Sequence, residues 1–531
     1  MNNSDVIFKS WAPRWLVTAS IFAVLLSSVL LFAISTADSI AAVGFYGAKP
    51  SDIQFSMLMF YAAVASFAVV ERRFFSRVVT KDYLIICILL EILITYWCYQ
   101  TRDISLIFIL RFLQGIVNCG LTSISLNLLF SRLKTEHAKE TGYTIFYGMI
   151  LCVSPITALF SVPIVENYEY NVLYKAIIFC FLPSTFLLFI VMKRIHIIPK
   201  TPLYKLDWSS FFLFATMLVL IAYVLIYGQE KDWLEDSGIV WSIAGVVFLA
   251  VVSIFRQLSL KRPSVDLEVF KSRNFAVGIV FLIILYIIRG AFGLTTSYFI
   301  NVLGMDSLHA NEIMFFNILG VIFGSVVAIR FLIKQKHLRV LWMFGFVLLF
   351  VFFLWMCLLF ASEAGTNNFY LPLFLQGMGA GMVMSPIVMF IMSSVPEKFS
   401  QSASSVGILV RFSTFSLSLA CINYFQLYFK GRHNDALRDR ISLLDFSLIG
   451  RLKTYESALI GRGMTPDLAN KAAVGLLNKA VQKQTFLQFC VSYYEIIALL
   501  CLLSIILIAL QPVISRTVIN LRGKQPAAVG F

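Results

Sequence analysis

Long apolar segments recur along nearly the whole chain, and they limit what it can fold into. A helix needs roughly 20 mostly apolar residues to cross a bilayer. Because lipid offers the backbone no hydrogen-bond partners, such segments must be helical. The sequence therefore predicts an all-α polytopic membrane protein with 14 spans, at 15–38, 52–71, 82–99, 104–130, 143–165, 172–192, 208–228, 239–257, 275–302, 309–333, 338–361, 368–395, 403–428 and 485–514.

Composition agrees with this prediction. The chain is 59% hydrophobic and 13% charged, whereas about 25% of residues are charged in soluble domains. The nine cysteines lie mostly inside apolar segments, without the spacing of disulfides or of a metal site. We therefore expect no metal and no cofactor. The first apolar segment is too long for the apolar part of a signal peptide, so we expect it to be retained as a span.

The distribution of basic residues predicts an orientation. Lys and Arg gather in the N-terminal tail, in every second short connection and in the C-terminal tail. The opposite short connections hold acidic stretches, ENYEY and QEKDWLED, and only Lys49, Arg102, Lys175 and Lys231 as basic residues. Cytoplasmic loops carry the excess of basic residues, so both termini are expected in the cytoplasm. The net charge of +15 is then a topology signal, and we expect no nucleic-acid partner.

One connection, residues 429–484, is much longer than the others. Apolar residues recur in it at helical spacing, and Thr465 followed by Pro466 has the pattern of a helix start. Long loops are translocated largely regardless of their charge. The connection is therefore predicted to form two amphipathic helices that lie on the outer surface.

The sequence FLQG occurs twice, at 112–115 and at 374–377. If the spans at 208–228 and 239–257 are an insertion, both copies fall in the fourth span of a six-span half. Gly115 follows the first copy's glutamine, and Gly377, Gly379 and Gly381 follow the second; small residues let helices approach closely. The repeat predicts two six-helix pseudo-repeat halves, 1–194 and 274–531, flanking an inserted region at 195–273.

Several segments also carry a family resemblance: LRFLQGIVNCG, LDWSSFFLF, LKRPSVDLEVFKSRNF and LQGMGAGMVMSP. With them the chain resembles major facilitator superfamily transporters, of the fourteen-span drug:proton antiporter branch. The resemblance implies the major facilitator fold, alternating access, and proton-coupled efflux of small lipophilic or amphipathic compounds. It also implies a bacterial cytoplasmic (inner) membrane protein. Its partners would be a small-molecule substrate, protons and, in a Gram-negative host, a periplasmic adaptor protein.

Two stretches depart from the family pattern. The connection VVERRFFSRVVTKDY lacks the expected glycines, and VSPITALFS keeps only Pro155 of the antiporter motif. An importer, a narrow metabolite exporter and a non-transporting sensor or scaffold therefore stay open. An enzyme is not expected, since the five histidines form no catalytic or metal-binding pattern and no phosphate-binding Gly-Lys-Ser/Thr loop occurs.

Charged residues inside spans are the candidate site residues, because a charge at mid-bilayer costs about 2.5–3.5 kcal/mol. Arg111 leads, since the resemblance implies a role in proton coupling or substrate contact. Glu91 lies at similar depth in the neighbouring span, and we expect it to pair with Arg111. Three intramembrane arginines also permit an anionic substrate. Pro155 and Pro386 are expected kinks near a gate. The remaining candidates are Asp38, Arg289, Arg411, Gln114 and Gln376.

Overall fold

The computed structural model describes residues 7–75, 78–133, 137–195, 207–440 and 446–511, with positions 514 and 519. Within these residues it is helical, with one isolated bridge between Phe8 and Met192 as the only β pairing. Besides short turns of 3-10 helix, the helices are α2 Arg14–Ala37, α3 Ser39–Tyr46, α4 Pro50–Phe67, α5 Glu71–Phe75, α6 Thr80–Gln100, α7 Ile104–Arg132, α8 Ala138–Asn167, α9 Val172–Val191, α10 Trp208–Tyr227, α11 Ser237–Ser259, α12 Arg273–Ala291, α13 Gly293–Asn301, α14 Ser307–Ile313, α15 Phe315–Ile333, α16 Leu338–Leu359, α17 Tyr370–Ser393, α18 Ser400–Arg440, α19 Phe446–Ile460 and α20 Pro466–Leu510.

Thirteen helical segments of the described residues are long and apolar enough to cross a membrane. The remaining predicted span, 52–71, is occupied by α4, which has 18 residues and begins with the polar stretch Ser51–Gln54. Most of α4 is buried, because α2, α7, α10 and α18 pack around it. A helix enclosed by protein needs less apolar surface than one facing lipid, so its lower hydropathy fits its place. The predicted polytopic helical fold class is confirmed.

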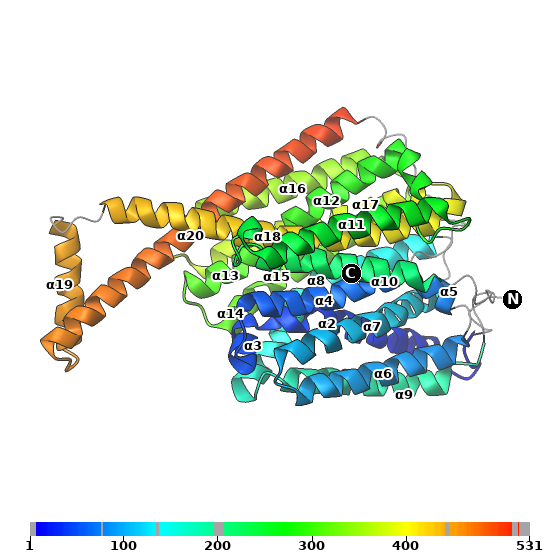
Figure 1. Cartoon of the computed structure of the whole chain (residues 1–531), viewed down its shortest axis with the longest axis horizontal. Coiled ribbons are helices and arrows are strands. Elements are labelled where there is room, and N and C mark those ends of the chain that lie inside the picture. Colours follow the sequence, from blue (N-terminus) through cyan, green and yellow to red (C-terminus); the bar gives the residue numbers. More distant parts are fainter. Residues whose placement is uncertain are drawn as a thin grey trace.

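Helices α2 to α9 form one group, and α12 to α18 with α20 form a second group beside it (Figure 1). Helix α10 packs against α4 of the first group and α18 of the second, and α11 packs mainly on α10. The two groups meet chiefly where α8 contacts α14, α15 and α17. The inserted pair α10–α11 therefore bridges the two halves on one side, and α8 forms the seam between them.

The long connection 429–484 is helical, as predicted, but its placement differs. Helix α18 continues to Arg440 and α20 starts at Pro466 with Thr465 as N-cap, so the predicted helix start is confirmed. Both helices project beyond the bundle as an arm, and α19 packs on α20 (Figure 1). Helix α19 is a separate helix, as expected, whereas the second expected helix is the first part of α20, which runs on into the last span and projects beyond the bundle instead of lying on its surface.

The glycines of the two FLQG copies make equivalent contacts. A Cβ atom at Gly115 of α7 would overlap the Phe60 carbonyl oxygen of α4, and one at Gly377 of α17 would overlap the Asn317 carbonyl oxygen of α15. In each half, the fourth span thus lies against the backbone of the second span. This equivalence is the structural meaning of the repeated sequence.

Close approach extends along α15 and α17. Gly320 and Gly324 of α15 face the backbone of α17, while Gly377 and Gly381 of α17 face the backbone of α15. Both pairs have the four-residue spacing of a Gly-x-x-x-Gly contact. On another face of α17, a Cβ at Gly379 would lie 2.9 Å from the Gly345 carbonyl oxygen of α16. Helix α17 is therefore fixed tightly between two neighbours.

A polar network fastens the inserted helices at the end where the chain begins. Asp207 caps α10, accepting hydrogen bonds from the Ser210 amide at 3.1 Å and from Arg256 of α11 at 2.8 Å. Gln257 donates to the Ser210 hydroxyl at 2.8 Å. Partial burial of Asp207 opposes its ionisation, but the hydrogen bonds from Ser210 and Arg256 outweigh it and hold the pKa of Asp207 below its ordinary value.

Replacing Gly377 by Leu is expected to destabilise the bundle by about 1–3 kcal/mol, because the new side chain must displace the backbone of α15. The measurement is the thermal unfolding midpoint of the purified protein in detergent. Gly475→Leu is the matched control, since nothing lies within 4 Å of a Cβ at that helical glycine. Equal midpoints for the two variants would contradict the close contact.

The Asp207 cap predicts a pH effect of defined sign. Because the pKa of Asp207 is depressed in the folded state, its stabilisation is complete above the ordinary carboxyl pKa of about 3.9 and is lost as pH falls through the folded value. The unfolding midpoint of wild type should exceed that of Asp207→Asn at pH 7, and the difference should shrink below about pH 4. Glu268→Gln, at an exposed ion pair, is the control and should show little difference at either pH.

Candidate functional site

Arg111 is fully buried at the centre of the first half. Its Nη1 donates to the Leu31 carbonyl at 3.0 Å and to Gln114 Oε1 at 3.1 Å, and its Nη2 donates to the Phe32 carbonyl at 3.4 Å. Its guanidinium group also lies over the Phe60 ring, 4.6 Å from the centroid. Arg111 therefore joins α7 to the C-terminal third of α2 through backbone carbonyl groups.

Glu91 of α6 is also fully buried, but the expected ion pair with Arg111 is wrong in this conformation. Both carboxyl oxygens of Glu91 lack a hydrogen-bond partner among the described residues. Arg111 instead uses its donors on α2 and Gln114. An unpaired ionised carboxylate is costly in such surroundings, and a protonated carboxyl group costs far less. The site thus holds a carboxyl group whose charge has no direct partner.

Further polar side chains continue from Arg111 along one face of α7, at spacings of three and four residues. Gln114 donates to the Thr95 hydroxyl at 2.9 Å, and Asn118 donates to the Ser28 carbonyl at 3.2 Å. Thr122 donates to the Asn118 carbonyl at 2.7 Å. The sequence analysis missed Asn118 and Thr122, although their helical spacing from Arg111 is a readable signal. We call Glu91, Arg111, Gln114, Thr95 and Asn118 the Arg111 cluster.

Arg411 lies at the seam between the halves, on α18, with 2% of its surface exposed. Its Nη1 donates to the Tyr147 hydroxyl of α8 at 2.7 Å, and its Nε donates to the Gly407 carbonyl at 3.2 Å. A small cavity beside it, with a volume of about 10 Å³, is also lined by Leu282, Ile391 and other residues. Tyr147 was not singled out from the sequence, because nothing local marks a partner 264 residues away.

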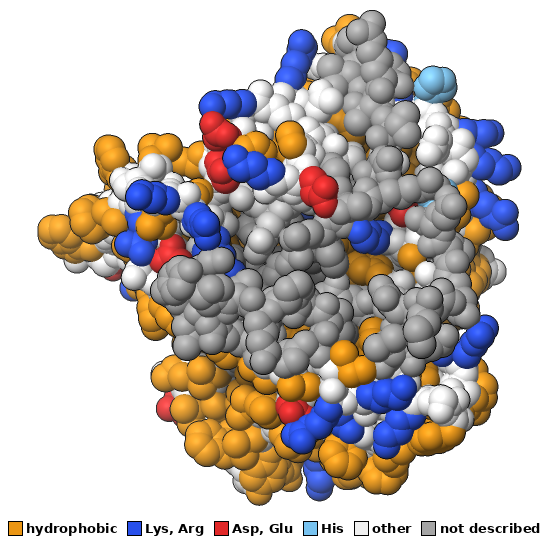
Figure 2. All heavy atoms as spheres, turned by 90° about the vertical axis from the view of Figure 1, so that its right-hand side faces the viewer, with side chains coloured by type: hydrophobic (Ala, Val, Ile, Leu, Met, Phe, Trp, Pro, Cys, Tyr) orange, Lys and Arg blue, Asp and Glu red, His pale blue; other side chains and the backbone are white. Residues whose placement is uncertain are grey.

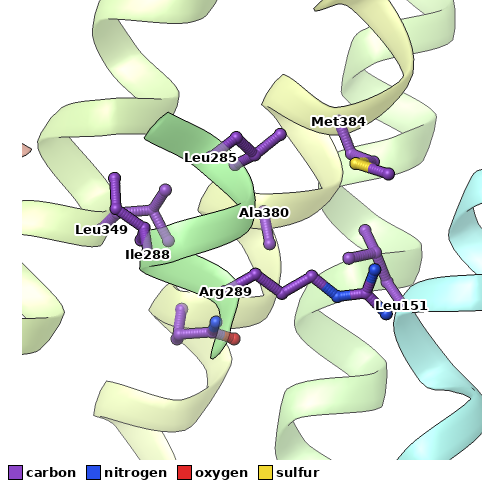
Figure 3. A pocket seen from close by; sticks show the side chains of 8 residues that line it. Leu151, Leu285, Ile288, Arg289, Leu349, Ala380 and Met384 are labelled. Atoms are coloured by element: carbon purple, nitrogen blue, oxygen red, sulfur yellow. The ribbon is translucent and has the colours of Figure 1, made fainter. Parts of the chain in front are cut away.

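Arg289 reaches the same helix from α12. Its Nη2 donates to the Ile150 carbonyl of α8 at 2.9 Å. Pro155 has no N–H, so the Leu151 carbonyl in this turn of α8 lacks its usual helix hydrogen bond. Arg289 points toward Leu151 across a second cavity of about 10 Å³ (Figure 3). We call Arg289 and Arg411 the interface arginines.

The two FLQG glutamines both lie near an arginine. Gln114 is hydrogen-bonded to Arg111, and Gln376 lines the cavity that holds Arg289. Gln376 Oε1 accepts a hydrogen bond from Asn317 of α15 at 2.5 Å. Asn317 also donates to the Leu373 carbonyl at 3.0 Å, so it fixes the orientation of Gln376. The structure brings Gln376 and Arg289 together, but it keeps them apart from the Arg111 cluster.

The other predicted residues have local roles. Asp38 is the N-cap of α3, where its Oδ1 accepts from the Ala41 amide at 3.0 Å. Pro155 lies inside α8 and Pro386 inside α17, and both helices are continuous through them. The described residues contain no group of three or more His, Cys, Asp or Glu side chains that could hold a metal ion.

Replacing Arg111 by Lys is expected to lower the free energy of unfolding by about 1.5–3 kcal/mol. An ammonium group is a point charge that cannot reach the Leu31, Phe32 and Gln114 oxygens at once. The measurement is the thermal midpoint in detergent. Arg102→Lys, at an exposed ion pair with Glu169, is the control and should leave the midpoint unchanged. An Arg111→Lys midpoint equal to wild type would show that the fork of bonds is not needed.

Comparison with known proteins agrees with this architecture. The probable multidrug resistance protein EmrY of Escherichia coli K12 is 22% identical over 408 residues, which cover 74% of this chain and 76% of that protein. The multidrug export protein EmrB of the same strain is 22% identical over 381 residues, 70% and 72% of the two chains. The colistin resistance protein EmrB of Acinetobacter baumannii is 22% identical over 354 residues, 66% and 68%.

Among solved structures, a peptide transporter POT in complex with sulfate superposes with a TM-score of 0.56 at 14% identity. The match covers 96% of this chain and 100% of that one. Identity at this level supports the fold alone. Residues 16–419 match the family described as Major Facilitator Superfamily. The match spans well over half of the chain, so the chain belongs to the major facilitator superfamily.

Proposed function

We propose that this chain is a secondary active transporter that exports small lipophilic or amphipathic compounds, coupled to protons, by alternating access. The observation that carries the proposal is the seam between the halves. There, Arg289 and Arg411 of the second half both bind α8 of the first half beside two small cavities. The names of the EmrY and EmrB relatives support multidrug export as the direction of transport.

The cavity volumes fit one stage of such a cycle. Pockets that hold drug-sized ligands have volumes of about 300–1,000 Å³, whereas each of these cavities has about 10 Å³, room for about one water molecule. The seam is therefore closed around the interface arginines in this conformation. Relative movement of the two helix groups would open it, and α8 with its partners α12, α17 and α18 would be the elements that separate.

We propose that the end of the bundle opposite the α18–α20 arm faces the cytoplasm. Figure 2 views this end and shows Lys and Arg side chains at several places around it, with fewer acidic ones. At the arm end, Lys49 and Arg102 are paired with Glu230 and Glu169. The positive-inside rule then gives cytoplasmic termini in a bacterial inner membrane. The arm would extend into the periplasm, where an adaptor protein of a Gram-negative host could reach it.

Within this function, the Arg111 cluster is the proposed proton-coupling site. Glu91 is buried without a hydrogen-bond partner, while the Arg111 charge lies close enough to act on it. A carboxyl group that gains a proton in one conformation and pairs with Arg111 in the other would link protonation to movement of α6 and α7. Gln114, Thr95 and Asn118 would then hold Arg111 in position.

The test of export is dye accumulation in a bacterial host depleted of its own exporters. Wild type is expected to lower the accumulation of at least one lipophilic dye, and a protonophore should abolish the effect. A chain that protects against no compound at normal membrane levels, or whose effect survives the protonophore, would contradict proton-driven export.

Glu91→Gln tests the coupling role. The amide cannot release a proton, so uptake driven by a pH gradient into inverted vesicles is expected to fall at least tenfold. Exchange of labelled for unlabelled compound without a gradient should be retained, because binding and movement are intact. Glu312→Gln, at an exposed residue near the start of its span, is the control. Normal gradient-driven uptake by Glu91→Gln would remove Glu91 from the coupling mechanism.

A further inference from the structure

We propose that the interface arginines form an anion-binding site, so that the compounds carried by this protein combine a negatively charged group with an apolar body. This inference rests on the proposed function, because it names the substrate class of the same seam. It is carried by four features: the position of both guanidinium groups against α8, the lack of an acidic partner, the unused N–H donors, and the apolar walls beside them.

The two guanidinium groups bind the same helix of the first half. Arg411 binds the Tyr147 hydroxyl of α8, and Arg289 binds the Ile150 carbonyl of α8. The cavities beside them lie next to different residues of α12 and α17. Arginines on two different helices of the second half therefore place their charges along α8, at the seam with the first half.

Neither charge is neutralised by a carboxylate. Among the described residues, no Asp or Glu forms an ion pair with Arg289 or Arg411. Arg411 is held by the Tyr147 hydroxyl and the Gly407 carbonyl, and Arg289 by the Ile150 carbonyl. A buried cation at Arg411 and a half-buried one at Arg289, held only by neutral oxygens, leave an uncompensated positive potential, which is costly without a ligand. An anion would supply the missing charge.

Within the described residues, both arginines have N–H donors that form no hydrogen bond. A guanidinium group has five N–H donors, but within the described chain Arg411 uses only Nε and Nη1, and Arg289 uses only Nη2. The unused donors belong to side chains that line the two cavities. Carboxylate, sulfonate and phosphate oxygens match the planar fork of such groups. A cation would meet repulsion from two sides.

The rest of the seam is apolar. The cavity at Arg289 is walled by Leu285, Leu349 and Met384, and the cavity at Arg411 by Leu282 and Val388. Such walls stabilise an apolar ligand body in proportion to the area removed from water. The ligand chemistry is therefore that of a lipophilic anion rather than a small inorganic one.

The test uses three probes of matched shape on the purified full chain in detergent: naphthalene-2-sulfonate, neutral naphthalene-2-sulfonamide, and (naphthalen-2-yl)trimethylammonium. Titration calorimetry is expected to give at least tenfold tighter binding of the sulfonate than of either other probe. Arg289→Gln and Arg411→Gln should each weaken sulfonate binding by about tenfold or more. Arg102→Gln, at an exposed arginine paired with Glu169, should leave sulfonate binding unchanged.

Either of two results would overturn the inference. One is binding of the cation as tight as that of the sulfonate, and the other is an unchanged sulfonate affinity in Arg289→Gln. Arg289 is only half-buried, so its variant is expected to fold and decides the question even if Arg411→Gln does not. Proton-driven transport of the cation alone in proteoliposomes would retain the proposed export and reject the anion site. Sulfonate binding without transport of any probe would retain the anion site and reject the proposed export.

Discussion

The requirement that every backbone polar group be satisfied within hydrocarbon underlies the whole structure. It makes each span a helix, and it removes the usual hydrophobic drive for helices to associate, because lipid is as apolar as Leu side chains. Association must then come from close packing and polar contacts. The glycine contacts of α15 with α17 and of α7 with α4 supply the first. Arg111, which binds α2, and the interface arginines, which bind α8, supply the polar contacts.

These two kinds of contact have different consequences for movement. Glycine contacts join helices within one half, where backbones lie in direct contact and little sliding is possible. The arginines at the seam reach across to α8 by single side-chain bonds to a carbonyl and a hydroxyl. Such bonds can be exchanged for others at small cost. The structure is therefore rigid within its halves and adaptable between them, as alternating access requires.

Sequence patterns located the helices well, because hydropathy reports directly on contact with lipid. The predicted 104–130 and 172–192 correspond to α7 and α9 within two residues at each end. The same signal failed where a helix breaks inside the span or continues beyond it. Predicted span 275–302 is two helices, α12 and α13, and α18 and α20 continue beyond the bundle. Hydropathy reads the edge of the bilayer, whereas helix ends depend on local hydrogen bonding.

The candidate site was only partly readable for a related reason. Residue type and depth identified Arg111, Arg289 and Arg411, since a charge inside a span is rare whatever its partner. Their partners were not readable: Arg111 binds backbone carbonyls, which every residue carries, and Arg411 binds a tyrosine far away in the chain. Opposite charges at equal depth suggested Glu91 for Arg111, but the direction of each side chain around its helix decides contact.

The oxygen atoms that Arg289 and Arg411 bind could not be predicted from the sequence, and they also connect binding to movement in the proposed mechanism. An anion that enters the seam would first bind the guanidinium donors that are unused in this structure, and it would then compete with the Ile150 carbonyl and the Tyr147 hydroxyl for the others. The neutral oxygens would lose this competition, because hydrogen bonds to a charged acceptor are roughly twice as strong. Binding would then release α8 from α12 and α18. The ligand would thus loosen the arginine bonds across the seam, which act beside the packing of α8 on α14, α15 and α17.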